Sequence, residues 1–400
     1  MMNKIPKGWE VKKLGEICEI TMGQSPKGEN VFENSQSLNG LEFHQGKICF
    51  TDKFISKSKF ITSDIRKIAE VGSILLCVRA PVGVINLTER KIAIGRGLCA
   101  LKANNQNNNF LYYYLLGLKQ YFESKATGST FSAITLNIVK NCEIPLPPLS
   151  EQKAIVDKLD DSFAKIENAI TNLINAKENL KLYKQSVLKS AFNGDLLPNT
   201  SPTHWEVKKL GEIFNVIGGG TPNTNNAEFW GGNISWISSA DIDKENFNAI
   251  PRKFITENAI QNSATNLVPK NTIIVVTRVG LGKVAITKEP MCFSQDSQAL
   301  IPFEKINVKF MAYQIKQIAQ NFINISRGTT INGITKQNLK DCKICVPTLS
   351  EQNLIVAEID RRFAIVDKTL NLIDKSIQNA KNLKQSILKK AFSGELRSDI

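Results

Sequence analysis

Pairs of polar residues recur at matching positions in the two halves of this 400-residue chain. Arg79 aligns with Arg278, whereas Arg96 aligns with Gln295. An arginine can donate two hydrogen bonds to O6 and N7 of guanine, and a glutamine can pair in a similar way with N6 and N7 of adenine. The unlike pair is therefore typical of two surfaces that read different bases, and the like pair of a shared task such as contact with phosphate. A second interpretation stays open for Arg96 and Gln295, namely that both are surface turn residues without a base partner.

Small hydroxyl side chains beside basic residues form a second matching set. Gly128-Ser129-Thr130-Phe131 follows Lys125, and Gly328-Thr329-Thr330-Ile331 follows Arg327. Hydroxyls and glycine amides on a basic loop suit hydrogen bonds to phosphate oxygens, although such a loop also forms ordinary helix caps and turns. Together with the two pairs above, the candidate nucleic-acid-binding residues are Arg79, Arg96, Ser129, Thr130, Arg278, Lys283, Gln295, Arg327, Thr329, Thr330 and Asn332.

The motifs of catalysis are missing from the sequence. Leu146-Pro147-Pro148-Leu149 does not fit the [DN]-P-P-[YFW] signature of amino-methylation, and Gly280-Leu281-Gly282-Lys283 lacks the spacing of a phosphate-binding loop. Two histidines and no paired acid cluster leave few groups for acid–base chemistry. The lone Cys342-Lys343-Ile344-Cys345 has a proline in place of its second cysteine in the first half, which argues against zinc. We therefore expect a chain that is not an enzyme and holds no metal or cofactor of its own.

The bulk composition favours a soluble protein with an anionic partner. The net charge is +14 and 42% of the residues are hydrophobic, which is typical of a folded protein that binds a polyanion such as nucleic acid. We find no secretory signal, no run of apolar residues long enough for a membrane span, and too few cysteines for a disulfide framework. The expected compartment is the reducing cytoplasm, with no membrane partner.

A repeated frame surrounds two unlike inserts. Trp9 to Ile17 returns unchanged as Trp205 to Ile213, and Pro148-Leu149-Ser150-Glu151-Gln152 returns with one substitution as Thr348-Leu349-Ser350-Glu351-Gln352. The short apolar runs Ser73 to Val78 and Thr272 to Val276 predict buried strands, and an aromatic-rich helix is expected over Phe110 to Phe122, matched by Phe310 to Phe322. The expected fold class is α+β, with two mixed α/β domains, at residues 1–148 and 194–347, built on one scaffold.

Two long helices are predicted after these domains, over residues 149–193 and 348–393, followed by a tail at 394–400. Ser150 is the expected N-cap of the first helix, and Gly194 and Gly394 are the expected ends. Apolar residues recur at alternating spacings of three and four for about six heptads, which predicts a coiled-coil seam in helices roughly 64 Å long. The predicted seam residues are Ile155, Leu159, Phe163, Ile166, Ile170, Leu173, Ile355, Ile359, Phe363, Val366, Leu370 and Ile373.

Connectivity limits how these parts are arranged. The second domain follows the end of the first helix, so the second helix must run back antiparallel if its apolar stripe packs on the first. The result is an internal pseudo-twofold repeat in which the helices separate the two domains. Lys184 and Lys384 fall on the seam, where a polar residue can fix the register or can extend to solvent from a wet end.

This arrangement resembles the specificity (S, or HsdS) subunit of type I restriction-modification systems over essentially the whole chain. The motifs that carry the resemblance are the duplicated Trp-Glu-Val-Lys-Lys-Leu-Gly-Glu-Ile opening, the Leu-Ser-Glu-Gln helix starts, Gly219-Gly220-Thr221-Pro222, Phe229 to Ile237, Val78 to Gly83, and Gly95-Arg96-Gly97. The first domain has Gly23-Gln24-Ser25-Pro26 in place of Gly-Gly-Thr-Pro. The two domains are thus of different subtypes, which fits unlike half-sites.

The resemblance implies two target-recognition domains that each read one half of a bipartite double-stranded DNA site. It implies that the helices act as a spacer and dock two methyltransferase (HsdM) subunits, which restriction and translocase (HsdR) subunits then join. S-adenosylmethionine, ATP and Mg²⁺ would be bound by those partners.

Two other functions stay open from the sequence. One is a specificity subunit of a type IIB-like system, in which methylase and nuclease share one partner chain. The other is a coiled-coil adaptor that binds nucleic acid, including RNA.

Overall fold

The computed structural model describes residues 5–33, 40–128, 132–198, 202–326 and 333–396. The chain divides into two compact units: unit 1 is Met1–Asn175 with Ile373–Ile400, and unit 2 is Ala176–Leu372. The long helices α5 (Leu149–Phe192) and α10 (Leu349–Ser393) each contribute to both units. None of the described helices has the length and apolar content of a membrane span.

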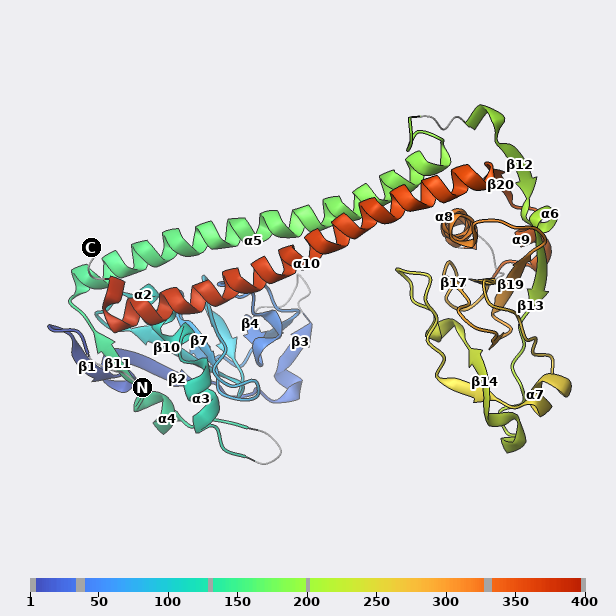
Figure 1. The fold of residues 1–400 in the computed structure, drawn as a ribbon. Coiled ribbons are helices and arrows are strands. Elements are labelled where there is room, and N and C mark those ends of the chain that lie inside the picture. Colours follow the sequence, from blue (N-terminus) through green and yellow to red (C-terminus); the bar gives the residue numbers. More distant parts are fainter. Residues whose placement is uncertain (1–4, 34–39, 129–131, 199–201, 327–332, 397–400) are drawn as a thin grey trace. The chain divides into compact units, whose positions relative to one another are not determined.

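We call the mixed α/β part of unit 1, from β1 to β11, head 1 (Figure 1). β1 (Glu10–Lys13) pairs antiparallel with β11 (Glu143–Leu146), the strand that leads into α5. An antiparallel sheet in the order β2-β10-β7-β8 contains β2 (Cys18–Met22), β7 (Ile74–Cys77), β8 (Ile85–Leu87) and β10 (Leu98–Ala103). A second sheet in the order β3-β5-β4-β9-β6 contains β3 (Val31–Glu33), β4 (Leu41–His44), β5 (Phe60–Thr62), β6 (Ile68–Ala69) and β9 (Ile92–Ile94). The helices are α1 (Leu14–Ile17), α2 (Asn108–Leu116), α3 (Lys119–Lys125) and α4 (Leu136–Lys140).

Head 2, from β12 to β20, repeats this plan in unit 2. β12 (Glu206–Lys209) pairs with β20 (Lys343–Val346). The four-stranded sheet β13-β19-β16-β17 contains β13 (Phe214–Gly218), β16 (Ile273–Val276), β17 (Val284–Ile286) and β19 (Ser297–Pro302). The second sheet, β15-β14-β18, contains β14 (Trp230–Ile237), β15 (Lys253–Ile255) and β18 (Cys292–Phe293). The helices are α6 (Leu210–Ile213), α7 (Glu257–Gln261), α8 (Val308–Ser326) and α9 (Lys336–Lys340).

The central strands β7 and β16 confirm the buried strands predicted from the sequence. All four residues of each strand are buried. Alternate side chains of a strand point to opposite faces, so Ile74 and Leu76 enter one apolar core while Leu75 and Cys77 enter another. β16 divides its residues between two cores in the same way. A strand covered on both faces needs an unbroken apolar run, which is the signal the sequence carries.

One predicted helix is wrong in head 1. The sequence predicts a single helix over Phe110 to Phe122, matched by Phe310 to Phe322, but head 1 has two helices that break at Gly117, whereas α8 is continuous. The chain tightens at the break, where Gly117 N donates to Tyr114 O and Leu118 N donates to Leu115 O. Glycine is the poorest helix former after proline, and Gln317 stands at the matching position in α8.

The duplicated motifs attach each long helix to its head. Gln152 is buried, accepts a hydrogen bond from Asn107 N at 3.0 Å, and donates to Pro147 O at 2.9 Å. Gln352 makes the same two contacts in head 2, with Asn307 N at 2.8 Å and Pro347 O at 2.9 Å. The repeated glutamine therefore satisfies buried backbone groups where strand passes into helix.

The start of each helix needs one correction. Both helices begin at leucine, so Ser150 lies inside α5 and is not its N-cap. In α10 the preceding Thr348 makes the capping contacts, since its hydroxyl bonds Glu351 and accepts from Glu351 N. Gly194 and Gly394 follow the helices with φ of 80° and 81°, as expected for helix ends.

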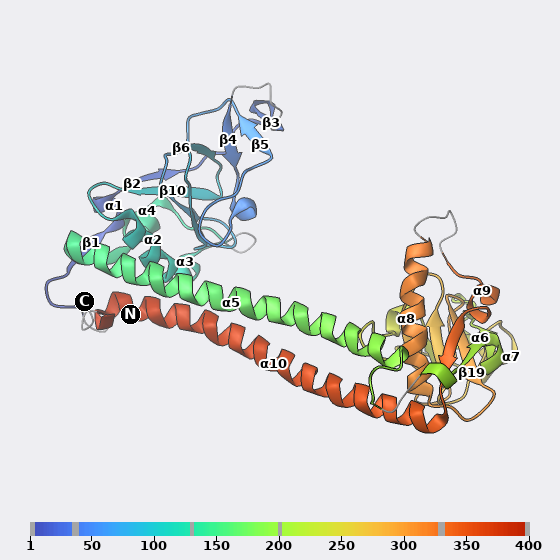
Figure 2. The ribbon, with the colours of Figure 1, turned by 90° about the horizontal axis from the view of Figure 1, so that it is seen from above.

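The predicted seam residues are buried or half-buried in both units. In unit 1 the first turns of α5 pack beside the last turns of α10, so that Ile155, Leu159 and Phe163 share a core with Leu388 and Ala391 (Figure 2). The two helices therefore run antiparallel there. In unit 2 the roles are exchanged: Ile355 and Ile359 of α10 share a core with Val187 and Ala191 of α5.

Each head receives a phenylalanine from the helix that starts in the other unit. Phe392, in the last turn of α10, packs edge-to-face on Phe110 and Tyr114 with ring centroids 5.3 and 5.1 Å apart. Phe192, in the last turn of α5, packs in the same way on Phe310 at 5.7 Å. Each unit is thus a head, the first part of the helix that follows it, and the last part of the other helix.

The seam lysines pair with acids on the facing helix. Lys384 Nζ lies 2.6 Å from Glu167 Oε1 and 5.1 Å from the centre of the Phe163 ring. In unit 2, Lys184 Nζ bonds Asp367 and lies 4.8 Å from the centre of the Phe363 ring. Because both acids are more than half exposed, we expect each ion pair to add little stability. Each lysine pairs with an acid at one defined position of the facing helix. This supports the interpretation that the lysines fix the register of the helices over the interpretation that they only extend to solvent.

Candidate nucleic-acid interface

Arg79 lies in the loop that follows β7, between two other loops of head 1. Val78 N donates to Gly97 O at 3.0 Å, which ties this loop to the turn that carries Arg96. On its other side, Ala80 N donates to Ser132 O and Ile134 N donates to Val78 O. Arg79 and Arg96 are both exposed. Ser129 and Thr130 lie outside the described residues, but the segment that follows them is hydrogen-bonded beside Arg79.

Head 2 places its loops in the same order. Thr277 N and Arg278 N both donate to Asp296 O, which ties the Arg278 loop to the turn that carries Gln295. Ile334 N donates to Thr277 O at 2.8 Å, and so attaches the third loop. Arg278 and Gln295 are exposed. The predicted residues Arg327, Thr329, Thr330 and Asn332 lie outside the described residues.

Lys283 differs from the other candidates because its ammonium group is already engaged. It is half-buried, and Nζ donates to Ser239 O at 2.7 Å. This contact holds the loop of Ser239 against the strand β17, which Lys283 precedes. Its contribution to a positive surface remains a prediction.

The turn that carries Arg96 is packed tightly on the end of β4. A Cβ atom on Gly95 would lie 2.2 Å from Gln45 Oε1, and one on Gly97 would lie 2.4 Å from Gln45 O. No other residue fits at either position without displacing Gln45. Arg96 is therefore held out to solvent between two glycines that cannot be replaced, which is a rigid way to present a side chain.

A hydroxyl at one repeat position bonds a glutamine in each head, and sequence reasoning missed these contacts. In head 1 the Ser25 hydroxyl donates to Gln45 Oε1 at 3.0 Å. In head 2 the Thr221 hydroxyl donates to Gln295 Oε1. The signal was available in part, since Gly23-Gln24-Ser25-Pro26 and Gly219-Gly220-Thr221-Pro222 occupy equal positions. Nothing local in the sequence indicates the glutamine partners.

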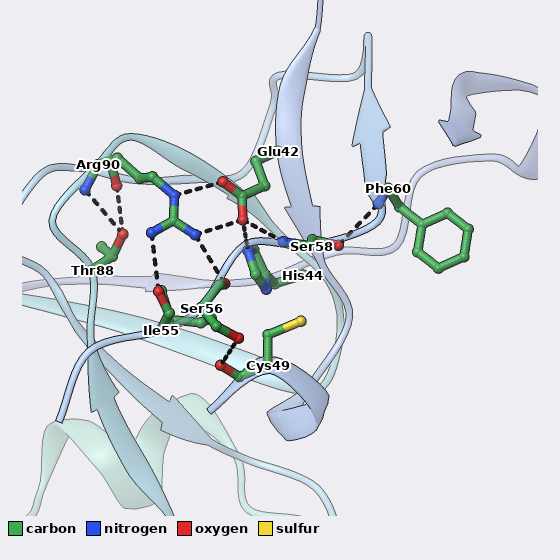
Figure 3. A network of polar contacts seen from close by, with 9 residues as sticks. All are labelled: Glu42, His44, Cys49, Ile55, Ser56, Ser58, Phe60, Thr88 and Arg90. Carbon is green, nitrogen blue, oxygen red and sulfur yellow. Dashed lines mark hydrogen bonds and ion pairs between the residues drawn. The ribbon is translucent and has the colours of Figure 1, made fainter. Parts of the chain in front are cut away.

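A buried polar network supports the end of β4 in head 1 (Figure 3). Arg90 donates to both carboxylate oxygens of Glu42 at 2.6 Å, and to the carbonyls of Ile55 and Ser56. Glu42 also accepts from Ser58 N at 2.6 Å and contacts His44 Nε2 at 2.8 Å. The His44 ring is buried, and its other nitrogen, Nδ1, has no hydrogen-bond partner among the residues that the structure describes.

The network shifts the pKa values of its members. Burial alone would raise the pKa of Glu42, but hydrogen bonds from Arg90, Ser58 and His44 outweigh it and lower that pKa to about 2. Burial lowers the pKa of His44, although the contact with Glu42 acts in the opposite direction. Glu42 is therefore ionised and His44 neutral near pH 7.

Head 2 has different residues at the positions of this network. The parallel pairs Phe43–Ala93 and Trp236–Cys292 align the strands of the two heads, so Ser235 stands for Glu42, Ile237 for His44 and Glu289 for Arg90. Ser235 donates to Glu289 at 2.7 Å. The frame is common to both heads, while the polar contacts between these strands are not.

The described residues contain no group of three His, Cys, Asp or Glu side chains that could hold a metal ion. Cys342 and Cys345 are half-buried, and Cys342 Sγ lies 3.2 Å from Asn338 O.

Comparison with known proteins gives the family of this chain. A model of the type I restriction modification DNA specificity domain matches residues 6–176 and again 202–380. The chain therefore belongs to this family and carries its domain twice.

The chain is 34% identical over 203 residues to the putative type I restriction enzyme MjaX specificity subunit of Methanocaldococcus jannaschii; this match covers 50% of this chain and 46% of that protein. It is 31% identical over 257 residues to the EcoR124I/EcoR124II specificity subunit of Escherichia coli, a match that covers 62% of this chain and 60% of the relative. These two matches thus span about half to three fifths of the relatives. A chain solved in work on assembly and conformational transition of the type I R-M system has the same fold, with a TM-score of 0.78 and 24% identity over 98% of this chain and 100% of that one.

Proposed function

We propose that this chain is the DNA sequence-specificity subunit of a type I restriction-modification complex. One observation carries the proposal: each head brings an exposed arginine at a strand end, Arg79 or Arg278, against a second exposed turn that carries Arg96 or Gln295. Arginine beside an exposed polar turn is suited to hold phosphate and to read base edges. The net charge of +14 supplies the attraction to a polyanion.

The unlike support in the two heads favours an asymmetric, bipartite site. Residues 1–148 and 194–347 would each read one half-site. Head 1 presents Arg96 and contains the Glu42–Arg90 network, whereas head 2 presents Gln295 and has Ser235 and Glu289 in place of Glu42 and Arg90. Two heads with different exposed groups are expected to prefer different bases.

The helices would set the spacing of the half-sites and dock the partner subunits. We expect two methyltransferase subunits to dock on the helices. Apolar side chains exposed on the helices fit such helix-on-helix contact. They are Ile174, Leu182, Leu354, Ile365, Leu372 and Leu383. Each methyltransferase would act on an adenine that is flipped out of the duplex, with S-adenosylmethionine bound in its own site. ATP-driven translocation and cleavage would belong to restriction subunits.

Replacing Arg79 or Arg278 with alanine tests the DNA-binding surface. Each change is expected to weaken binding of the methyltransferase complex to its duplex and to reduce the slope of log affinity against log salt by about one. Because an arginine stands at this position in both heads and is expected to contact phosphate, its loss should leave the base preference unchanged. Binding is measured by fluorescence anisotropy over a salt series, with Lys336→Ala, at an exposed position of α9, as the control. Equal preference for RNA, or unchanged slopes in both arginine variants, would contradict the proposal.

A matched insertion in both helices tests the spacer. Seven residues added after Asn175 and again before Ile373 keep the heptad phase and lengthen each helix by roughly 10 Å. The preferred gap between half-sites should grow by about three base pairs, since B-DNA rises 3.4 Å per pair. Mapping of methylated sites in cells reads the gap directly. Insertion in α5 alone is the control, because it breaks the pairing and should abolish methylation.

A further inference from the structure

The hydroxyls of Ser25 and Thr221 are positioned by the same backbone contact in the two heads. Gln24, the residue before Ser25, donates its backbone N–H to Ile94 O at 3.1 Å, at the end of β9. The residue before Thr221, Gly220, does the same to Phe293 O at 2.9 Å, at the end of β18. Both hydroxyl residues are half-buried, so each is fixed below an exposed partner.

The two glutamines come from different loops but reach the same place. Gln45 follows β4, whereas Gln295 follows β18, which matches β9. β4 and β9 are parallel neighbours, as are β14 and β18, so their carboxyl ends meet at one edge of the sheet. The backbone joins those ends in both heads, since Gly95 N donates to His44 O and Ser294 N donates to Ile237 O. Gln295 therefore corresponds to Arg96 by repeat position and to Gln45 by its place at this edge of the sheet.

The contact with a hydroxyl restricts the rotamers of the glutamine side chain. Both glutamines are exposed, and an exposed glutamine normally samples many rotamers. In head 1 the Gln45 amide meets Ser25 Oγ through both of its polar atoms, at 3.0 and 2.9 Å. An amide has two N–H donors and two acceptor lone pairs, so one of each remains for a ligand. In head 1 the hydroxyl occupies the edge at which the N–H and the C=O lie side by side. The remaining N–H and lone pair point in different directions, so each can make a single hydrogen bond to a base edge.

We propose that Gln45 in head 1 and Gln295 in head 2 each contact a base edge in the half-site of their head, and that Ser25 and Thr221 are positioning residues that hold these amides. The inference rests on the proposed function. It adds two residues, Ser25 and Thr221, and one reader, Gln45, that neither repeat position nor family membership assigns.

The test uses the chain co-expressed with its methyltransferase subunits and a library of duplexes with randomised half-sites. Gln45→Ala is expected to reduce the base preference at one position of one half-site by about 10-fold. Gln295→Ala should do the same in the other half-site, so each variant has an internal control in the half-site it leaves unchanged. Gln337→Ala, on the exposed face of α9, controls for loss of an exposed glutamine.

The hydroxyl variants separate positioning from a merely structural role. Thr221→Val keeps the shape of the side chain, and Ser25→Ala removes only the oxygen. Each should weaken preference at the same base pair as its glutamine, and the double variant Thr221→Val/Gln295→Ala should be no worse than Gln295→Ala alone. Loss of preference spread over the whole half-site, or unchanged preference in both glutamine variants, overturns the inference while sequence-selective binding by the unaltered complex persists. Absence of any sequence preference in the unaltered complex overturns the proposed function as well.

Discussion

Replacing Phe392 with alanine should destabilise unit 1 by about 2–4 kcal/mol and leave unit 2 unchanged, because this ring fills a gap between Phe110 and Tyr114 at the end of α10. The residue lies far from head 1 in sequence, but its core is that of head 1. Hydrogen exchange resolved by mass spectrometry measures the effect, and the peptides of α2 and β10 should exchange faster.

Phe192→Ala is the matched control, since it removes the equivalent ring from Phe310 in unit 2. It should accelerate exchange in α8 and β19 and spare head 1. If Phe392→Ala accelerated exchange in head 2 and Phe192→Ala in head 1, or if each variant accelerated exchange equally in both heads, the helix ends would not pack as described.

Replacing Arg90 with methionine is expected to cost about 3–5 kcal/mol, because it leaves the Glu42 carboxylate buried without its cation. The Glu42 side chain is only 15% exposed and receives two hydrogen bonds from Arg90. The double variant Glu42→Gln/Arg90→Met removes the unpaired charge while it keeps an acceptor for Ser58 N, so it should regain part of the loss. Urea unfolding monitored by exchange in β4 and β9 gives the comparison. A double variant weaker than Arg90→Met would contradict this account.

Acid should reveal the same network. The pKa of Glu42 is lowered in the folded protein, so its contribution to stability is complete above the ordinary value of 4.5 and is lost as the pH falls from there toward 2. The pKa of His44 is also lowered, from 6.5, so the unfolded chain takes up a proton first and stability begins to fall below that pH. Head 2 has Ser235 and Ile237 at these positions and lacks both contributions. Head 1 should therefore lose exchange protection at higher pH than head 2.

Patterns that are local in the sequence predicted the fold well. The heptads of α5 and α10 and the apolar runs of β7 and β16 each reflect one element that is buried along a fixed period. The break at Gly117 was missed because a single glycine is tolerated inside many helices, and its effect depends on the contacts around it. The start at Leu149 was misplaced because Ser150 is an ordinary capping residue by type.

The residues of the candidate site could be predicted only where positions in the two halves of the sequence could be matched. Matching positions brought Arg79 and Arg278 to attention, and the structure places each beside the predicted turn of Arg96 or Gln295. Their contacts with DNA remain predictions. The contacts of Ser25 with Gln45 and of Glu42 with Arg90 depend on parallel pairing of β4 and β9, strands separated by a long insert. Such pairing leaves no periodic trace in the sequence, so these partners could not be found before the fold was known.

The exchange of helix ends also affects how the protein is made. Head 1 is translated before head 2, but Ile387, Leu388, Ala391 and Phe392, which close its core, are synthesised only after all of head 2. Head 2 needs Val187 and Ala191, which precede it, and can close as soon as α10 begins. The half of the molecule that is translated first is therefore completed last, and until then its nascent core is open to chaperones and proteases.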